Sequence, residues 1–265
     1  MWKWQAEGEA RGVAVLIHSA YEEHRRYAWQ IEKWRTSGFD VYMGDLPGHG
    51  IHAAQDGVHR EHFFEYDKMA AELLRLAAES SLPIVLVGHG LGAAIAIQAL
   101  VANRHPVSAA ILTSPWFELK KMPIKQSLAF SGISKLTRKR TVDHGLELSY
   151  LTRRKFQDGH QASTAINSVS TPAWWKQLQS YMELAAQTRI PDIPLMLHIG
   201  KRDLITKSSA SRSWLHQQKL SEFHFKEWDF CYHDLFQEPE QEAVFQQSLQ
   251  FARSVTDLLI EKNRE

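Results

Sequence analysis

The chain has 265 residues, of which 44% are hydrophobic and 23% charged, and its formal net charge at pH 7 is +1. This balance predicts a folded protein with a large core, and it argues against nucleic-acid binding through overall positive charge. A single cysteine, Cys231, excludes an internal disulfide and a cysteine-rich zinc site.

Short, nearly continuous apolar runs recur along the chain and predict buried parallel strands. In chain order these runs cover residues 12–18, 40–44, 83–88, 109–113 and 195–200, followed by a strand-like run at 222–228. Between them, apolar side chains recur at helical spacing over residues 66–78, 91–101 and 240–260. This alternation predicts an α/β fold with a mostly parallel, doubly wound sheet that binds ligands at the carboxyl ends of its strands.

Residues 116–189 interrupt the alternation and are predicted to form a helical cap inserted into a core of residues 1–115 and 190–265. Residues 115–190 contain 12 Lys and Arg against 5 Asp and Glu, a net charge of +7. Residues 135–140 and 153–155 contribute most of this charge. The basic surface is either an ordinary solvated helical face or a face that attracts an anionic substrate or an anionic membrane.

The third apolar run leads into Gly88-His89-Gly90-Leu91-Gly92, after which a helix is predicted. A strand, a sharp turn and a helix, with glycines two residues before and two after the centre, describe a nucleophile elbow of the G-x-S-x-G type. The central residue of such a turn is held above the sheet at the start of the helix. Here that residue is Gly90 and not serine.

An acid and a histidine follow the turn, so the chain order is nucleophile position, acid and histidine, which is one of the known orders of a catalytic triad. Asp203 comes directly after the strand predicted at 195–200, and His233 follows the run at 222–228. In a catalytic triad the imidazole takes the proton of the nucleophile, and the carboxylate orients the imidazole. Two backbone N–H groups would stabilise the oxyanion, one from Leu91 and one from the loop around Ser19 and Ala20.

Four motifs together resemble the lysophospholipase and monoacylglycerol-lipase branch of the α/β-hydrolases, especially its small bacterial members. They read HSAYE at 18–22 followed by Arg26 and Tyr27, DLPGHG at 45–50, GHGLG at 88–92, and YHD at 232–234 followed by Glu238. The resemblance implies an α/β-hydrolase fold with a cap and hydrolysis of carboxylic esters. It assigns the catalytic acid to Asp203, the base to His233 and the oxyanion donors to Ala20 and Leu91, and it implies no metal or cofactor.

Three residues depart from the pattern of that family. Gly90 replaces the serine, Ser19 stands where the family has glycine, and Ala93 stands where it usually has a second glycine. Loss of a catalytic serine typically lowers kcat by about 10⁶. We also expect Ser19 to strain the loop that presents Ala20, because serine tolerates positive φ poorly.

Gly90 has three explanations: natural loss of catalysis, a Ser→Gly variant made to trap a ligand, or another attacking group. We favour natural loss, because Ser19 and Ala93 are further changes in the same machinery. Ser19 is the best candidate for a substitute nucleophile, and water activated by His233 is another. Cys231 lies only two residues before His233 and outside the elbow, so we interpret it as a packing residue.

Two functions follow from these alternatives. The first is an ester-hydrolase scaffold for lysophospholipid or monoacylglycerol-like esters with little or no turnover. The second is a non-catalytic protein that holds a lipid ester, a fatty acid or another small molecule, or that docks through its basic cap. No signal peptide is recognisable and no apolar run reaches the roughly 18 residues of a membrane span, so we expect a cytoplasmic location, with contact to a membrane surface through the cap.

Overall fold

A seven-stranded sheet forms the centre of the computed structural model, which describes residues 1–102, 104–120, 141–154 and 168–262. The sheet order is β1-β3-β2-β4-β5-β8-β9, and all neighbouring strands are parallel except β1 and β3. The strands are β1 (Trp2–Trp4), β2 (Gly12–Ile17), β3 (Phe39–Met43), β4 (Ile84–His89), β5 (Ala109–Thr113), β8 (Leu195–Gly200) and β9 (Phe223–Trp228).

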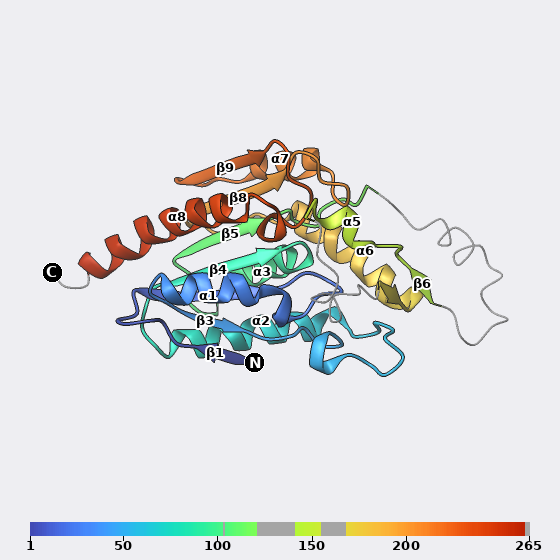
Figure 1. The fold of residues 1–265 in the computed structure, drawn as a ribbon, viewed down its shortest axis with the longest axis horizontal. Coiled ribbons are helices and arrows are strands. Elements are labelled where there is room, and N and C mark those ends of the chain that lie inside the picture. Colours follow the sequence, from blue (N-terminus) through green and yellow to red (C-terminus); the bar gives the residue numbers. More distant parts are fainter. Residues whose placement is uncertain (103, 121–140, 155–167, 263–265) are drawn as a thin grey trace.

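Helices cover both faces of this sheet (Figure 1). One face packs against α1 (Ala28–Thr36) and α8 (Gln241–Lys262), whose buried side chains share a core with β3. The other face packs against α2 (Phe63–Ala78), α3 (Leu91–Ala102) and α7 (Ser208–Gln217). Strands β2, β4, β5 and β8 are buried along their whole length, as the unbroken apolar runs predicted.

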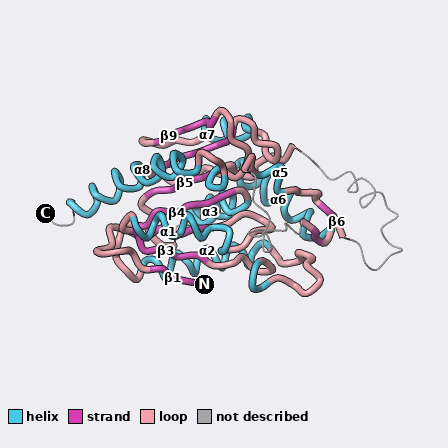
Figure 2. Tube along the Cα trace, in the orientation of Figure 1, coloured by secondary structure: helices cyan, strands magenta, loops and turns pink. Residues whose placement is uncertain are grey.

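A further group of elements lies beyond the carboxyl ends of the strands. It contains α5 (Leu148–Leu151), α6 (Pro172–Gln187) and a two-stranded sheet of β6 (Val142–Asp143) and β7 (Val169–Ser170). Figure 2 shows β6 well apart from the main sheet, and the strand arrows in Figure 1 point toward the same side. These elements fall within the range 116–189 for which a cap is predicted, and residues 121–140 and 155–167 of that range lie outside the described chain, so the cap stays a prediction.

The strand order reverses direction between β2 and β4, and this reversal positions the candidate site. From β2 the chain moves outward to β3, and then returns to β4 on the other side of β2. Ile17 at the end of β2 pairs with Gly88 near the end of β4. Loops that leave these two carboxyl ends therefore face each other, which is the usual ligand position in an open α/β sheet.

Two helices and one strand beside the main sheet were not predicted from the sequence, nor were the short strands β6 and β7 in the range expected to be helical. The helix α1 buries only Gln30, Ile31 and Trp34, and α7 buries only Ser211 and Trp214, so neither has a strong apolar stripe. The strand β1 has three residues and pairs with one neighbour only at the edge of the sheet. The fold class and the main elements are nevertheless confirmed, with boundaries displaced by at most three residues.

Candidate active site

The sharp turn predicted after the third apolar run is present at Gly90. Its φ is +56°, and its N–H donates a hydrogen bond to the Thr113 carbonyl at 3.0 Å. The flanking glycines are required by close packing, because a Cβ on Gly88 would lie 2.6 Å from the Gly92 carbonyl oxygen. The turn thus presents position 90 at the start of α3, above the carboxyl ends of β2, β4 and β5.

Asp203 and His233, which are 30 residues apart in the chain, meet beside this turn. The His233 Nδ1 lies 2.8 Å from Asp203 Oδ2, and both side chains are 1% exposed. The other carboxylate oxygen of Asp203 accepts hydrogen bonds from the Ile205 and Thr206 N–H groups at 2.6 and 2.9 Å. The carboxylate is therefore held rigidly, and it fixes Nε2 as the outward-facing nitrogen of His233.

The electrostatics of the pair favour a charged carboxylate and a basic imidazole. Burial alone raises the pKa of Asp203, but His233 and the Thr206 hydrogen bonds outweigh burial and leave this pKa lowered. Burial alone lowers the pKa of His233, but the Asp203 carboxylate outweighs it and this pKa is raised. The arrangement is that of an acid–histidine dyad able to accept a proton at Nε2.

Trp116 forms a hydrogen bond with Nε2 of His233, the ring nitrogen that does not face Asp203. Its indole Nε1–H donates to His233 Nε2 at 3.0 Å, and the Trp116 side chain is buried. Nearby, the Ser114 hydroxyl donates to the His233 carbonyl at 2.7 Å. The sequence assigned Trp116 to the cap, but its place directly after β5 could have indicated a residue at the carboxyl edge of the sheet.

Ser19 fills the space above Gly90. A Cβ at position 90 would overlap the Ser19 hydroxyl, and it would lie 2.8 Å from the Ser19 Cβ and 3.0 Å from the Trp116 Nε1. The same hydroxyl accepts a hydrogen bond from the Leu91 N–H at 3.1 Å. The two positions that depart most clearly from the hydrolase motifs are thus in direct contact, and the serine hydroxyl at position 19 compensates for the missing one at position 90.

The expected strain at Ser19 is absent, and this prediction was wrong. Among the described non-glycine residues, positive φ occurs at Tyr21 (65°), Ser81 (57°) and Ser114 (43°). The loop after β2 makes its left-handed turn at Tyr21, directly after Ala20, so Ser19 keeps an ordinary backbone conformation. Its N–H donates to the Glu22 carboxylate at 3.1 Å, which anchors the loop from within.

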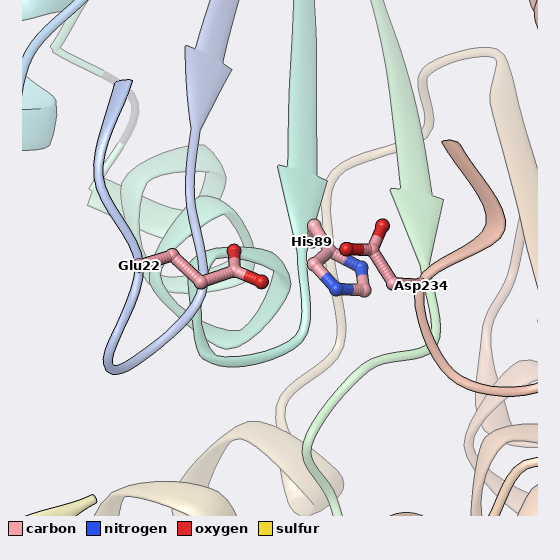
Figure 3. A group of neighbouring side chains, drawn as sticks. All are labelled: Glu22, His89 and Asp234. Carbon is pink, nitrogen blue, oxygen red and sulfur yellow. The ribbon is translucent and has the colours of Figure 1, made fainter. Parts of the chain in front are cut away.

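A cluster of buried polar side chains lies next to the acid–histidine dyad and links the loops of the site. Figure 3 shows the His89 ring between the carboxylates of Glu22 and Asp234. The His89 Nδ1 lies 3.0 Å from the Thr113 hydroxyl, and the rings of His89 and His233 are 4.9 Å apart. Glu22 holds the oxyanion loop, and Asp234 follows His233 directly, so the cluster connects three loops of the site.

The same three side chains have the donor types of a metal site, with ligand atoms within 4.8 Å of one another. Arg26, however, already supplies a cation to both carboxylates. Its guanidinium lies 3.2 Å from Glu22 Oε1, and it donates to Asp234 Oδ2 at 2.6 and 2.9 Å. A divalent ion would have to displace a buried guanidinium, so we interpret the cluster as structural.

A small apolar cavity lies on the cap side of the dyad. Its apolar lining comes from Trp116, Leu119, Leu146, Tyr150, Trp175 and Ile205. Trp116 is shared, since its ring lines the cavity while its N–H contacts His233. The described residues beyond the strand ends thus place a small apolar surface next to the candidate site.

Other candidates from the sequence do not join the site. Burial raises the pKa of the Cys231 thiol to about 12, which keeps the thiol protonated and makes it a poor nucleophile. The sequence also places four histidines close together, at positions 49, 52, 59 and 62, as a weak candidate for a metal site. The rings of His49 and His59 lie with centres 4.3 Å apart and are tilted by 38°, whereas His52 and His62 are exposed. Within the described chain these four do not form a cluster of metal-ligating atoms.

The sheet, the turn at Gly90 and the acid–histidine pair define an α/β-hydrolase. Residues 8–240 match the family model for serine aminopeptidases of the S33 type, and the chain belongs to this family. It is 33% identical to phospholipase YtpA of Bacillus subtilis, over 98% of this chain and 100% of that protein. It is 26% identical to a monoacylglycerol lipase of Mycolicibacterium smegmatis, over 91% of this chain and 88% of that protein.

A solved structure shows the same fold. The crystal structure of Paleococcus ferrophilus monoacylglycerol lipase superposes with a TM-score of 0.79 at 22% identity, covering 96% of this chain and 98% of the other. The protein is therefore a lipase- and lysophospholipase-like α/β-hydrolase by family and fold. In the described residues, none of the helices combines the length and apolar character needed to cross a bilayer.

Proposed function

We propose that this chain binds acyl lipids in the pocket of a lipase-like hydrolase and does not hydrolyse them through position 90. One observation carries the proposal: the chain itself satisfies the two groups that would serve the missing nucleophile. Ser19 accepts the Leu91 N–H, and Trp116 donates to His233 Nε2. The site is thus closed by its own side chains. It differs from the site of an active hydrolase by these two contacts as well as by the missing serine side chain.

These two contacts occupy groups that two steps of ester hydrolysis would use. In an active hydrolase the histidine nitrogen accepts the serine proton, and the backbone N–H after the nucleophile stabilises the oxyanion. Here an N–H donor faces the nitrogen, and a hydroxyl faces the backbone donor. Both groups are stable in this resting arrangement, so the structure favours a state without turnover.

The lipid class is supported by the cavity and by the relatives. The cavity next to Trp116 is lined mostly by apolar side chains, but it holds only about 20 Å³, so an acyl chain would have to displace some of them. Two relatives are named as a phospholipase and a monoacylglycerol lipase, and the first aligns with 98% of this chain. We therefore propose an acyl chain as the part of the ligand that the cavity receives.

Ser19 is the alternative nucleophile, but the geometry disfavours this role. A serine hydroxyl becomes a good nucleophile when a base accepts its proton. The His233 nitrogen that would do so is bonded to Trp116 instead, and Ser19 bonds to Leu91. Ser19 and Gly90 are also sterically matched, which supports natural loss of catalysis over a single engineered change at position 90.

Docking through the basic cap remains a prediction. Arg138, Lys139 and Arg140 lie outside the described residues. The described Arg153 is already paired, at 3.1 Å with Glu238 and at 2.6 Å with Glu240. This part of the cap charge is neutralised within the protein and does not favour membrane contact.

The test compares the unchanged chain with Gly90→Ser, Ser19→Gly and the double variant. We expect ester turnover at background for the first three proteins, because a serine at 90 overlaps Ser19. In the double variant the overlap is relieved, and turnover of p-nitrophenyl and monoacylglycerol esters should rise by at least about 10³. Each variant is checked for folding by circular dichroism, and labelling by a fluorophosphonate is mapped by mass spectrometry.

Two results would overturn the proposal. Ester turnover by the unchanged chain, with the fluorophosphonate on Ser19, would show that Ser19 is the nucleophile. A folded chain that retains no monoacylglycerol, fatty acid or lysophospholipid in a binding assay would remove the lipid-binding part. Restoration by Gly90→Ser alone would show that the packing of Ser19 does not close the site.

A further inference from the structure

We infer that the open edge of strand β9 pairs with the β9 of a second copy of this chain, antiparallel and centred on His224. The inference concerns a surface outside the site at Gly90 and does not depend on the proposed function. It follows from one open strand edge and from the self-complementary sequence Glu222-Phe223-His224-Phe225-Lys226.

Strand β9 ends the main sheet, and within the described chain it pairs with β8 alone (Figure 1). The carbonyls of Glu222 and Trp228 accept hydrogen bonds from the β8 side at 3.2 and 2.9 Å. Successive residues of a strand turn their N–H and C=O groups to alternate sides, so those of Phe223 and Phe225 point away from β8. In the described chain these outward groups have no backbone partner, and they are the groups that a further strand would bond to.

The sequence of this edge is complementary to itself when the second strand runs antiparallel. If His224 lies opposite its own copy, Glu222 lies opposite Lys226 of the second copy, and Phe223 lies opposite Phe225 of the second copy. Two-fold symmetry repeats both contacts, which gives two ion pairs and two aromatic pairs. With two-fold symmetry, no other register of this strand pairs Lys226 with a glutamate.

The orientation of the backbone agrees with this register. Phe223 and Phe225 carry the outward N–H and C=O groups, so each pair of these residues would exchange two hydrogen bonds across the interface. Glu222, His224 and Lys226 then occupy the alternate positions without such bonds, where opposing side chains lie closest. The charged pairs therefore fall at the positions that favour side-chain contact.

The side chains of the edge are accessible to a second copy. Phe223 is 54% exposed, and Phe225 is half-buried against the core cluster beneath α7, so Phe223 of the second copy would extend that cluster. Glu222, His224 and Lys226 are exposed. A lysine on an edge strand usually opposes pairing with another chain. Here its charge would gain a partner, Glu222 of the second copy.

Sedimentation of the full chain between about 1 and about 200 µM tests the pairing, since an interface of this small size is expected to be weak. We expect a dimer in this range. Lys226→Glu should weaken the dimer at least about tenfold, because two attractive pairs become repulsive, and Glu222→Lys should do the same. The double variant restores both pairs in reversed order and should dimerise like the unchanged chain. Lys176→Glu, on the exposed part of α6, makes the same charge change elsewhere and should leave the dimer intact.

Cysteine substitutions test the register. Opposite Cα atoms in a pair without hydrogen bonds lie about 4.5 Å apart, within the range of a disulfide. His224→Cys should therefore form a disulfide between two copies in oxidised glutathione, detected by non-reducing electrophoresis. Lys226→Cys should not, because its copy lies four residues further along the strand, about 13 Å away. The buried Cys231 is present in both variants.

Three results would overturn the inference. The first is a chain that stays monomeric over the whole concentration range. The second is a dimer that neither single charge reversal weakens, which would place the contact on another surface. The third is a His224→Cys chain that acquires glutathione alone and forms no disulfide between copies.

Discussion

Ser19 and Gly90 act as one pair, although they belong to different motifs. Relative to the hydrolase motifs, serine and glycine are exchanged between the oxyanion loop and the elbow. The elbow places its central residue at φ +56°, where glycine has no steric penalty and serine is strained. Glycine at 90 therefore relieves backbone strain, and serine at 19 fills the space and satisfies the Leu91 N–H.

A substitution of Trp116 tests its hydrogen bond to His233. The indole N–H bonds to a lone pair that only the neutral imidazole has, so it stabilises neutral His233. Trp116→Phe should raise the pKa of His233, and it should lower the free energy of unfolding by about 1 kcal/mol for the lost hydrogen bond. The checks are NMR titration of the His233 ring protons and unfolding in urea. The control is Trp214→Phe, whose indole donates to the Thr188 carbonyl at 3.0 Å instead, and an unchanged His233 pKa in Trp116→Phe would contradict the assignment.

The contact between strand β2 and helix α3 holds the two halves of the site together. A Cβ on Gly92 would overlap the Ile17 carbonyl oxygen and lie 2.7 Å from the Ile17 carbonyl carbon. Both neighbours are backbone atoms of a central strand, so neither can move without the sheet. The first turn of α3 can approach the end of β2 this closely only with glycine at position 92.

Gly92→Ala tests this packing. Alanine has the higher helix propensity by about 1 kcal/mol, so a helix free of this contact would gain stability. Here we expect a loss of about 3 kcal/mol, at the upper end of the range for overpacking. Gly8→Ala is the comparison, because its Cβ would meet nothing within 4 Å and only its φ of +82° is strained, so its loss measures backbone strain without overpacking. Equal stability of Gly92→Ala and the unchanged chain, measured by urea unfolding, would refute the close approach.

Over the whole molecule, several buried histidines make stability depend on pH. Burial is the main cause that lowers the pKa of His18, His49, His89, His144 and His198, to about 3 for the last two. Their stabilising contribution is present above the unfolded value near 6.5 and is lost as the pH falls. The pKa of His233 is raised, so its contribution is complete below 6.5 and is lost as the pH rises.

In the folded protein five of these histidines have a lowered pKa and one has a raised pKa. We therefore predict net proton uptake on unfolding in weak acid. The free energy of unfolding should therefore rise from pH 5 to pH 7, by about 1.4 kcal/mol per pH unit for each histidine that remains neutral in the fold. Urea unfolding across this range measures the slope. His198→Gln should reduce the slope by about one proton, and the exposed His216→Gln should leave it unchanged. A slope near zero would show that these rings are not buried in their neutral form.

Much of this could be read from the sequence, because the information is local. Buried parallel strands are continuous apolar runs, and the elbow and its missing serine are adjacent residues, so the α/β-hydrolase fold and the altered turn were both predictable. The order of Gly90, Asp203 and His233 likewise needs no coordinates. Elements with weak local patterns, such as α1 and β1, were missed for the same reason.

What fills the altered turn was decided by the tertiary structure alone. The bond between Ser19 and Leu91 joins residues 72 apart, and the bond between Trp116 and His233 joins residues 117 apart. Neither contact can be predicted from a periodic pattern or from neighbouring residues in the sequence. Each depends on the strand order that brings the ends of β2, β4, β5 and β8 to one edge of the sheet. The sequence shows that a hydroxyl is missing at position 90, and the fold determines which side chains take over its space and its partners.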